Sequence, residues 1–229
     1  MIAAVALGTL LVTAFGGSDQ PTGGIPAPAK AARLLPVGPP GRQAIARLGA
    51  LTIELPVNRS RITAVGYYAA SDGALGLTPL GTQANEGLLK RLAEAIFGGD
   101  SGWPRWYLLA GGDGPATSAL DVGAPSGTDV YAPVDGTIVG IDNVILDGKV
   151  YGQRVAIQPT LAPSLVVSVT DLAADPSLAV GGTVTAGSSK IGELIDLSKV
   201  ETQTLSHYTN DAGNHVLVEV YPAATLQLR

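Results

Sequence analysis

The chain has 229 residues, a net charge of −5 at pH 7, a pI near 4.9 and a hydrophobic fraction of 46%. This length allows one sizeable core or two small ones. The acidic balance argues against nucleic acid as a partner, because phosphate recognition needs a basic surface.

Residues 1–16 are apolar, and the first charged side chain is Asp19. In a helix this stretch spans about 24 Å, less than the roughly 30 Å of a bilayer's hydrocarbon core. The pattern favours a signal peptide, with small residues at Ala14 and Gly16 as cleavage positions, over a short membrane anchor. Either role places the chain in the cell envelope or outside the cell, with membrane contact through this segment. The alternative is a cytoplasmic protein with an apolar start. Residues 17–47 are dense in proline and glycine and predict a linker.

Residues 48–100 are predicted to form a small segment of strands followed by one helix. Apolar alternation predicts strands over residues 51–55 and 62–67, and a third over 74–77 close to an edge. Asp72 and Gly73 are typical of a hairpin turn. After Asn85, leucine and isoleucine spacing predicts a helix that ends at two glycines.

Aromatic residues are concentrated at 103–107, which contain both tryptophans of the chain, Trp103 and Trp106. Large aromatic side chains pack in cores and also line ligand grooves. The sequence leaves both roles open for this stretch.

Residues 101–229 are predicted to form an all-β core domain. Hairpin turns are indicated at Asp135–Gly136 and Asp147–Gly148. In the last predicted strand, which covers residues 215–220, His215, Leu217 and Glu219 alternate with valines and therefore share one face. Other predicted strands cover residues 130–133, 137–141, 154–157, 165–169 and 190–192.

Three segments of this domain resemble a known family. They read TSALDVGAPSGTDVYAPVDGTIVG from Thr117, VGGTVTAGSSKIG from Val180, and GNHVLVEV from Gly213. They resemble the core of the LytM, or lysostaphin-like, zinc metallopeptidases, which cut peptide cross-links in bacterial cell walls. The resemblance implies a mainly β fold with a LytM-type β-sheet core, a duplicated hybrid motif similar to the barrel-sandwich hybrid. It also implies peptidoglycan, or another cell-wall hydrolase, as the partner.

The resemblance assigns the family's functional positions one by one. The family's H-x-x-x-D falls on residues 117–121, its tyrosine-x-histidine-leucine element on 169–172, and its H-x-H on 215–217. Its zinc ligands therefore correspond to Thr117, Asp121 and Leu217. Its two histidines that orient water and stabilise the oxyanion correspond to Asp171 and His215.

These substitutions predict a degenerate metal site. Catalytic zinc takes three protein ligands of nitrogen, sulfur or carboxylate type, and leucine cannot be one. Of the three positions only Asp121 keeps a metal ligand, so we expect no cofactor, with weak binding of zinc or another divalent metal as the alternative. Asp171 would repel the negative charge that a histidine there stabilises. The second histidine of the chain, His207, is predicted to be an exposed loop residue.

Two functions follow from this pattern. The first is a non-catalytic LytM-type module of the cell envelope that binds peptidoglycan or regulates a wall hydrolase. The second is an active peptidoglycan or peptide hydrolase in which Asp121, Asp171 and His215 form an altered metal site. The second requires these three side chains to lie within about 5 Å of one another, because first-shell distances are near 2 Å.

Two other families with glycine-spaced hairpins fit the sequence less well. Lipoyl and biotinyl carriers attach their cofactor to a lysine at a hairpin tip, and the corresponding tip here, at residues 134–136, has none. Efflux-pump adaptors contain long helical hairpins, which the sequence does not predict.

Overall fold

The computed structural model describes residues 38–70, 73–85, 103–146 and 148–225. Four predicted features lie outside these ranges. They are the signal peptide or anchor, most of the linker, residue Asp72 of the predicted hairpin turn, and the helix predicted to follow Asn85. The part from Val37 to Arg229 forms one compact unit. In the described ranges, no helix has the length and apolar character needed to cross a membrane.

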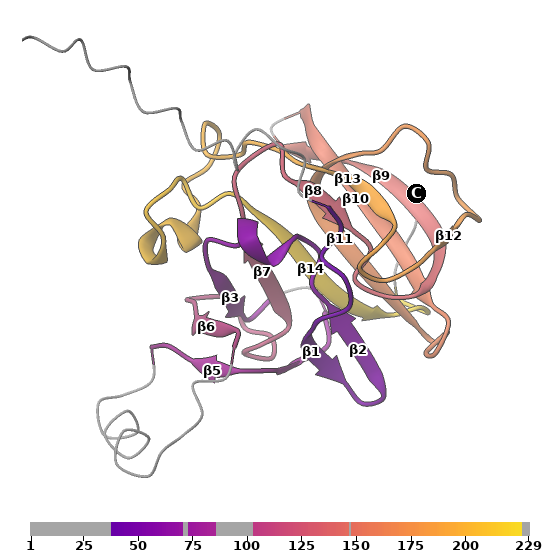
Figure 1. Ribbon diagram of the computed structural model, residues 1–229, viewed down its shortest axis with the longest axis horizontal. Helices are drawn as coiled ribbons and strands as arrows, with labels where there is room; N and C mark the ends of the chain where they lie inside the picture. Colours follow the sequence, from indigo (N-terminus) through magenta and orange to yellow (C-terminus); the bar gives the residue numbers. More distant parts are fainter. Residues whose placement is uncertain (1–37, 71–72, 86–102, 147, 226–229) are drawn as a thin grey trace, which may run out of the picture. The chain divides into compact units, whose positions relative to one another are not determined.

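The described residues are mainly β, as the sequence predicts (Figure 1). Two short 3-10 helices, η2 at Arg59–Arg61 and η3 at Thr204–Tyr208, interrupt the strands. The strands are β1 Ala44–Leu48, β2 Leu51–Glu54, β3 Val65–Tyr68, β4 Thr78–Pro79, β5 Thr82–Gln83, β6 Arg105–Leu108, β7 Ala119–Gly123, β8 Asp129–Tyr131, β9 Gly136–Leu146, β10 Lys149–Pro159, β11 Leu165–Ala174, β12 Thr183–Val184, β13 Lys190–Leu194 and β14 His215–Pro222.

The larger sheet brings distant parts of the sequence together. Its strands run in the order β12-β9-β10-β11-β14-β7-β3-β6-β5, with β13 and β8 attached beside β11. Within it, β14 lies between β11 and β7 and is antiparallel to both. Val216, Val218 and Val220 are fully buried, whereas His215, Leu217 and Glu219 are half-buried on the opposite face. The predicted alternation of β14 is confirmed, and its polar face is directed away from the main core.

The first strand begins inside the predicted linker. Residues 44–47 belong to β1, and Ile45 and Ala46 are fully buried. The Tyr67 hydroxyl donates a hydrogen bond to the carbonyl oxygen of Ile45 at 3.0 Å. The proline-rich composition ends near Gly41, so composition alone placed the linker boundary too late.

The predicted boundary at residue 100 does not separate two cores. Strand β3, from the predicted small segment, pairs antiparallel with β7 of the predicted core domain. Side chains from both strands, including Val65 and Val122, belong to one hydrophobic cluster. A small sheet in the order β2-β1-β4 completes this part. The third strand predicted over 74–77 is instead the two-residue β4 at Thr78–Pro79, which pairs with the edge of β1.

The aromatic stretch contributes to the core. Trp103 and Trp106 pack against the main cluster as partly buried side chains. Trp106 meets Tyr67 edge to face at a centroid distance of 5.3 Å. Of the two roles that the sequence left open for these tryptophans, burial is the one observed.

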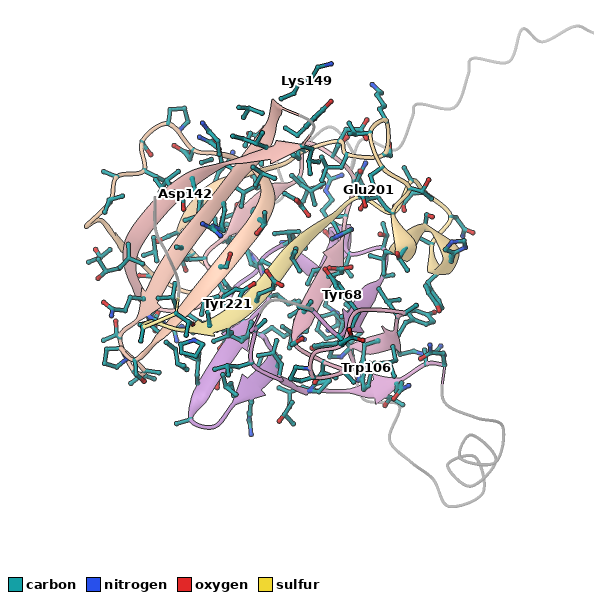
Figure 2. The ribbon with its side chains drawn as sticks, turned by 180° about the vertical axis from the view of Figure 1, so that it is seen from behind. Tyr68, Trp106, Asp142, Lys149, Glu201 and Tyr221 are labelled. Atoms are coloured by element: carbon teal, nitrogen blue, oxygen red, sulfur yellow. The ribbon has the colours of Figure 1, made fainter. Side chains whose placement is uncertain are left out.

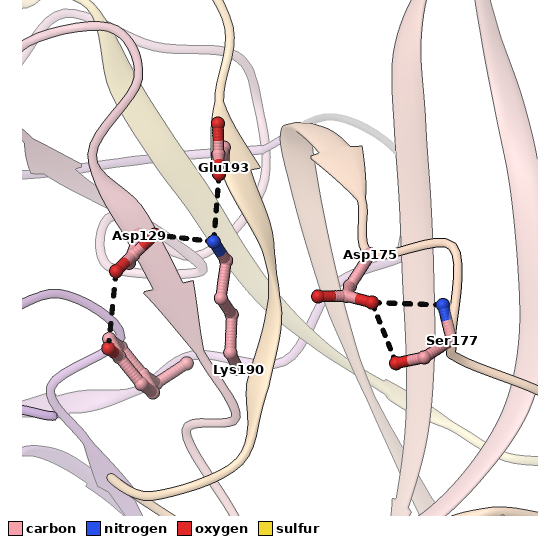
Figure 3. A network of polar contacts seen from close by, with 6 residues as sticks. Asp129, Asp175, Ser177, Lys190 and Glu193 are labelled. Carbon is pink, nitrogen blue, oxygen red and sulfur yellow. Dashed lines mark hydrogen bonds and ion pairs between the residues drawn. The ribbon is translucent and has the colours of Figure 1, made fainter.

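A surface ion-pair network joins β8 to β13 (Figure 3). The Lys190 ammonium lies 2.6 Å from Asp129 and 2.8 Å from Glu193. Nearby, Asp175 accepts hydrogen bonds from the backbone and hydroxyl of Ser177 and closes a turn. Exposed pairs of this kind stabilise weakly, and here they support the pairing of two short strands.

Candidate functional site

A cavity of about 420 Å³ opens on the polar face of β14. Its size is typical of small-molecule sites. In Figure 2, two of its residues are labelled: Tyr68 on β3 and Glu201 in the segment before η3. The lining consists of Tyr68, Ala110, Asp121, Val144, Leu146, Thr170, Asp171, Leu197, Glu201, Thr202, Gln203, Thr204, His215 and Leu217.

Strand register places three of the sequence-predicted residues in this cavity. Leu217 is the direct cross-strand partner of Asp121 on one side and of Thr170 on the other. His215 lies two residues before Leu217 and therefore shares its face. Asp121 is only 3% exposed, so it lies deep in the cavity.

Asp171 reaches the cavity through a β-bulge. Between the pairs Gln153–Leu172 and Val155–Val169, strand β10 has one residue where β11 has Thr170 and Asp171. Asp171 has φ = 67°, a left-handed conformation that few non-glycine residues adopt. Bulges commonly re-aim a side chain, and strained backbone clusters at functional sites. The bulge is held in place by hydrogen bonds from Ile195 N–H to the Asp171 carbonyl and from Ala174 N–H to the Gln153 side chain.

The three polar side chains converge on one another. His215 Nε2 lies 3.4 Å from Asp121 Oδ1 and 3.8 Å from Asp171 Oδ2. Asp121 Oδ1 is buried and accepts no hydrogen bond. His215 therefore approaches both carboxylates to within 4 Å.

The second ring nitrogen of His215 fixes how the proton is placed. Nδ1 lies 3.0 Å from the carbonyl oxygen of Gly213, which can only accept, so Nδ1 carries the hydrogen. A neutral ring of this tautomer would direct the Nε2 lone pair at two carboxylates. The contact becomes favourable when a further proton is held on Nε2 or on a carboxyl group. The cluster therefore binds one proton more readily than isolated side chains would.

Burial and mutual charge perturb all three groups. Burial raises the pKa of Asp121 to about 6, although His215 opposes the rise. Burial also raises the pKa of Asp171, with His215 again opposing it. Burial alone would lower the pKa of His215, but Asp121, the Gly213 carbonyl and Asp171 together raise it. Perturbed groups gathered in a cavity are typical of functional sites.

The residues at the family's zinc positions do not fit zinc. The Thr117 hydroxyl donates a hydrogen bond to the Leu77 carbonyl at 2.6 Å, and Thr117 does not line the cavity. Leu217, opposite Asp121, presents only carbon to it. Across the described ranges, no group of three or more histidine, cysteine, aspartate or glutamate side chains is arranged to hold a metal ion.

Several cavity residues were missed by the sequence reasoning. The segment with Leu197, Glu201, Gln203 and Thr204 forms one side of the cavity, although it has no strand pattern. Asn214 positions this segment, because its side chain accepts from Leu197 N–H and donates to Asp196. A buried asparagine next to His215 was the available signal. His207 is exposed, as predicted, and lies in η3 rather than in a loop.

No protein-family model matches this chain, and no curated protein sequence matches it. Among solved structures, Helicobacter pylori Csd3 in its hexagonal crystal form is 15% identical, with a TM-score of 0.37 over 81% of this chain and 34% of Csd3. Its orthorhombic form is 17% identical, with a TM-score of 0.37 over 77% and 33%. The M23 metalloprotease Pseudoalterin, from the deep sea, is 18% identical, with a TM-score of 0.34 over 78% and 75%.

The chain thus spans about a third of the length of the Csd3 structures that it matches. These TM-scores are too low to carry an argument about activity.

Proposed function

We propose that this chain is a non-catalytic, peptide-binding module of the cell envelope, which binds peptidoglycan or regulates a cell-wall hydrolase. The observation that carries the proposal is the cavity in which Asp121, His215 and Asp171 converge while Leu217 faces Asp121. A cavity of this size with deep polar groups and apolar sides suits ligand binding. The envelope location rests on the apolar segment at residues 1–16, and the wall ligand on the sequence resemblance to LytM peptidases.

Hydrolysis is disfavoured by the charges of the same site. Peptide hydrolysis develops negative charge on the carbonyl oxygen, and a catalyst places hydrogen-bond donors or a cation around it. This cavity contains three carboxylates, Asp121, Asp171 and Glu201, against a single histidine, His215, and no lysine or arginine among its described lining residues. A developing oxyanion would be repelled there.

The proposal is tested by co-sedimentation of the full chain with purified peptidoglycan sacculi. We expect binding without release of soluble wall fragments, and the same result after zinc is added. Leu217→Trp fills the cavity and should abolish binding, and Leu161→Trp is the matched control because Leu161 is 80% exposed. Thr204→Trp, at the exposed rim of the cavity, tests the same point if Leu217→Trp fails to fold.

Sedimentation that is equal for parent and both cavity variants would refute a role for the cavity. Release of wall fragments by the parent would instead favour a second candidate, an active hydrolase with an altered Asp/His metal site. The specific observation that favours this candidate is the approach of His215 to within 3.4 and 3.8 Å of the two carboxylates. It requires a stoichiometric metal in the purified protein, and the loss of both metal and lytic activity on chelation.

A further inference from the structure

The cavity has a graded interior, with charge at its base and apolar groups along its sides. The side chains of Asp121, His215 and Asp171 are 4%, 9% and 14% exposed, so these groups lie deep. Glu201 and Thr204 are exposed and lie at the mouth. The described lining also includes the larger aliphatic side chains of Val144, Leu146, Leu197 and Leu217.

The base of the cavity carries acceptors that the protein leaves unused. Asp121 Oδ1 is buried and accepts no hydrogen bond from any described group. The nearest cationic group is His215, whose Nε2 is 3.4 Å from that oxygen and is shared with Asp171 at 3.8 Å. Two carboxylates thus face one imidazole. Even with His215 protonated, the base is not positively charged, and Glu201 adds a negative charge at the mouth.

We propose that this cavity is a binding site for a primary alkylammonium group, the side chain of a lysine-type residue in a peptide. The ammonium is placed at Asp121 and Asp171 as a donor of three hydrogen bonds, and the alkyl chain lies along the aliphatic side chains. Tyr68 lines the same cavity, and tyrosine rings are among the groups that attract cations. The inference rests on the proposed function in one respect, because it names the part of a wall peptide that the cavity recognises.

The chemistry of the site favours an organic cation over a metal ion. Across the described part of the chain, no group of three or more histidine, cysteine, aspartate or glutamate side chains is arranged to hold a metal ion. Leu217 and the other aliphatic groups provide no ligand atoms, although they provide suitable contacts for methylene groups. An ammonium needs only the oxygen acceptors that are already present.

The inference is tested with two ligands that differ only in the charged group. N-acetyl-lysine-N-methylamide carries the ammonium, and N-acetyl-norleucine-N-methylamide replaces it by a methyl group. We expect NMR titration of the full chain at pH 7.5 to show binding of the lysine compound, at least tenfold tighter than the norleucine compound. Asp121→Asn and Asp171→Asn should each weaken lysine binding about tenfold and leave norleucine binding unchanged.

Glu193→Gln is the matched control, because it removes an exposed carboxylate outside the cavity and should change neither affinity. Equal affinity for the two ligands, or a lysine affinity unchanged in both cavity variants, would overturn the inference. Displacement of the lysine compound by equimolar zinc would also overturn it, since the site would then prefer a metal.

The outcome is separable from that of the proposed function. If the parent sediments with sacculi and does not distinguish the two ligands, the amine site is refuted and the proposed function stands. If it distinguishes the ligands and does not sediment with sacculi, the amine site stands and the wall ligand is refuted.

Discussion

Asp121→Asn is expected to make the protein more stable at neutral pH. Asp121 is buried, its Oδ1 accepts no hydrogen bond, and its pKa is raised from 3.8 to about 6. A raised carboxyl pKa means that the folded state holds the proton more tightly than the unfolded chain does. The stabilisation is therefore complete below pH 3.8 and is lost as the pH rises to about 6.

The size of the effect follows from the shift. About two pKa units at roughly 1.4 kcal/mol each correspond to about 3 kcal/mol, an upper bound for a group coupled to His215. The asparagine has nearly the same shape and no charge. We expect Asp121→Asn to gain on the order of 2 kcal/mol in the free energy of unfolding at pH 7.5, and to differ little from the parent near pH 4.

Urea denaturation of parent and variant at both pH values measures this difference. Asp135→Asn provides a control of opposite sign, because hydrogen bonding to Arg42 lowers the pKa of Asp135. Its carboxylate stabilises the fold above the unfolded-state pKa, and that contribution is lost as the pH falls through the folded-state value. A variant Asp121→Asn that is no more stable than the parent at pH 7.5 would show that pairing with His215 outweighs burial, and the reasoning would be refuted.

Three further predictions concern the metal positions and the packing. The Thr117 hydroxyl forms its hydrogen bond outside the cavity, so a histidine at position 117 should not reach a metal in the cavity. In calorimetric titration, the double variant Thr117→His with Leu217→His should therefore bind zinc no more tightly than Leu217→His alone. A tenfold gain in zinc affinity would contradict this. Gly81→Ala should lower the free energy of unfolding, measured in urea, by about 2–4 kcal/mol, because Gly81 has a positive φ and the new Cβ would meet the Pro104 backbone. Gly127→Ala, also at positive φ but in open space, should lower it by about 1 kcal/mol. Equal losses in the two variants would be inconsistent with the packing. Tyr67→Phe removes the hydrogen bond to the β1 carbonyl and should cost about 1 kcal/mol, and an unchanged midpoint would show that this link to β1 is unimportant.

The strands of this fold were predictable where apolar alternation was clear. His215 to Val220 alternates without interruption, and its buried and polar faces are those that the sequence predicts. Strand β1 was missed because its five residues follow closely on a proline-rich stretch and include the charged Arg47. The pairing of β3 with β7 could not be predicted, since strand order depends on contacts between distant segments rather than on local pattern.

The candidate site was predictable only in part, because its geometry also depends on contacts between distant segments. Asp121, Asp171 and His215 were identified through their motif positions, and register places them in one cavity. The bulge that turns Asp171 inward has no local signal, because its geometry depends on the partner strand β10. The orientation of Thr117 toward Leu77 also depends on a tertiary contact. Sequence motifs therefore identified the residues, and only the fold shows which of them line the cavity.

Stability and function are connected at Asp121. A buried carboxylate without a hydrogen-bond donor raises the free energy of the folded state, and nothing in the described packing offsets it fully. A cation that binds the folded protein and supplies the missing hydrogen-bond donors would remove part of this cost. The part that is removed then contributes to the binding free energy of the cation. The same reasoning explains why Leu217 suits the site: by excluding water next to Asp121, it strengthens the attraction of the carboxylate for an ammonium group. In the proposed site, the buried charge that His215 offsets only in part and the apolar side chain of Leu217 therefore act together.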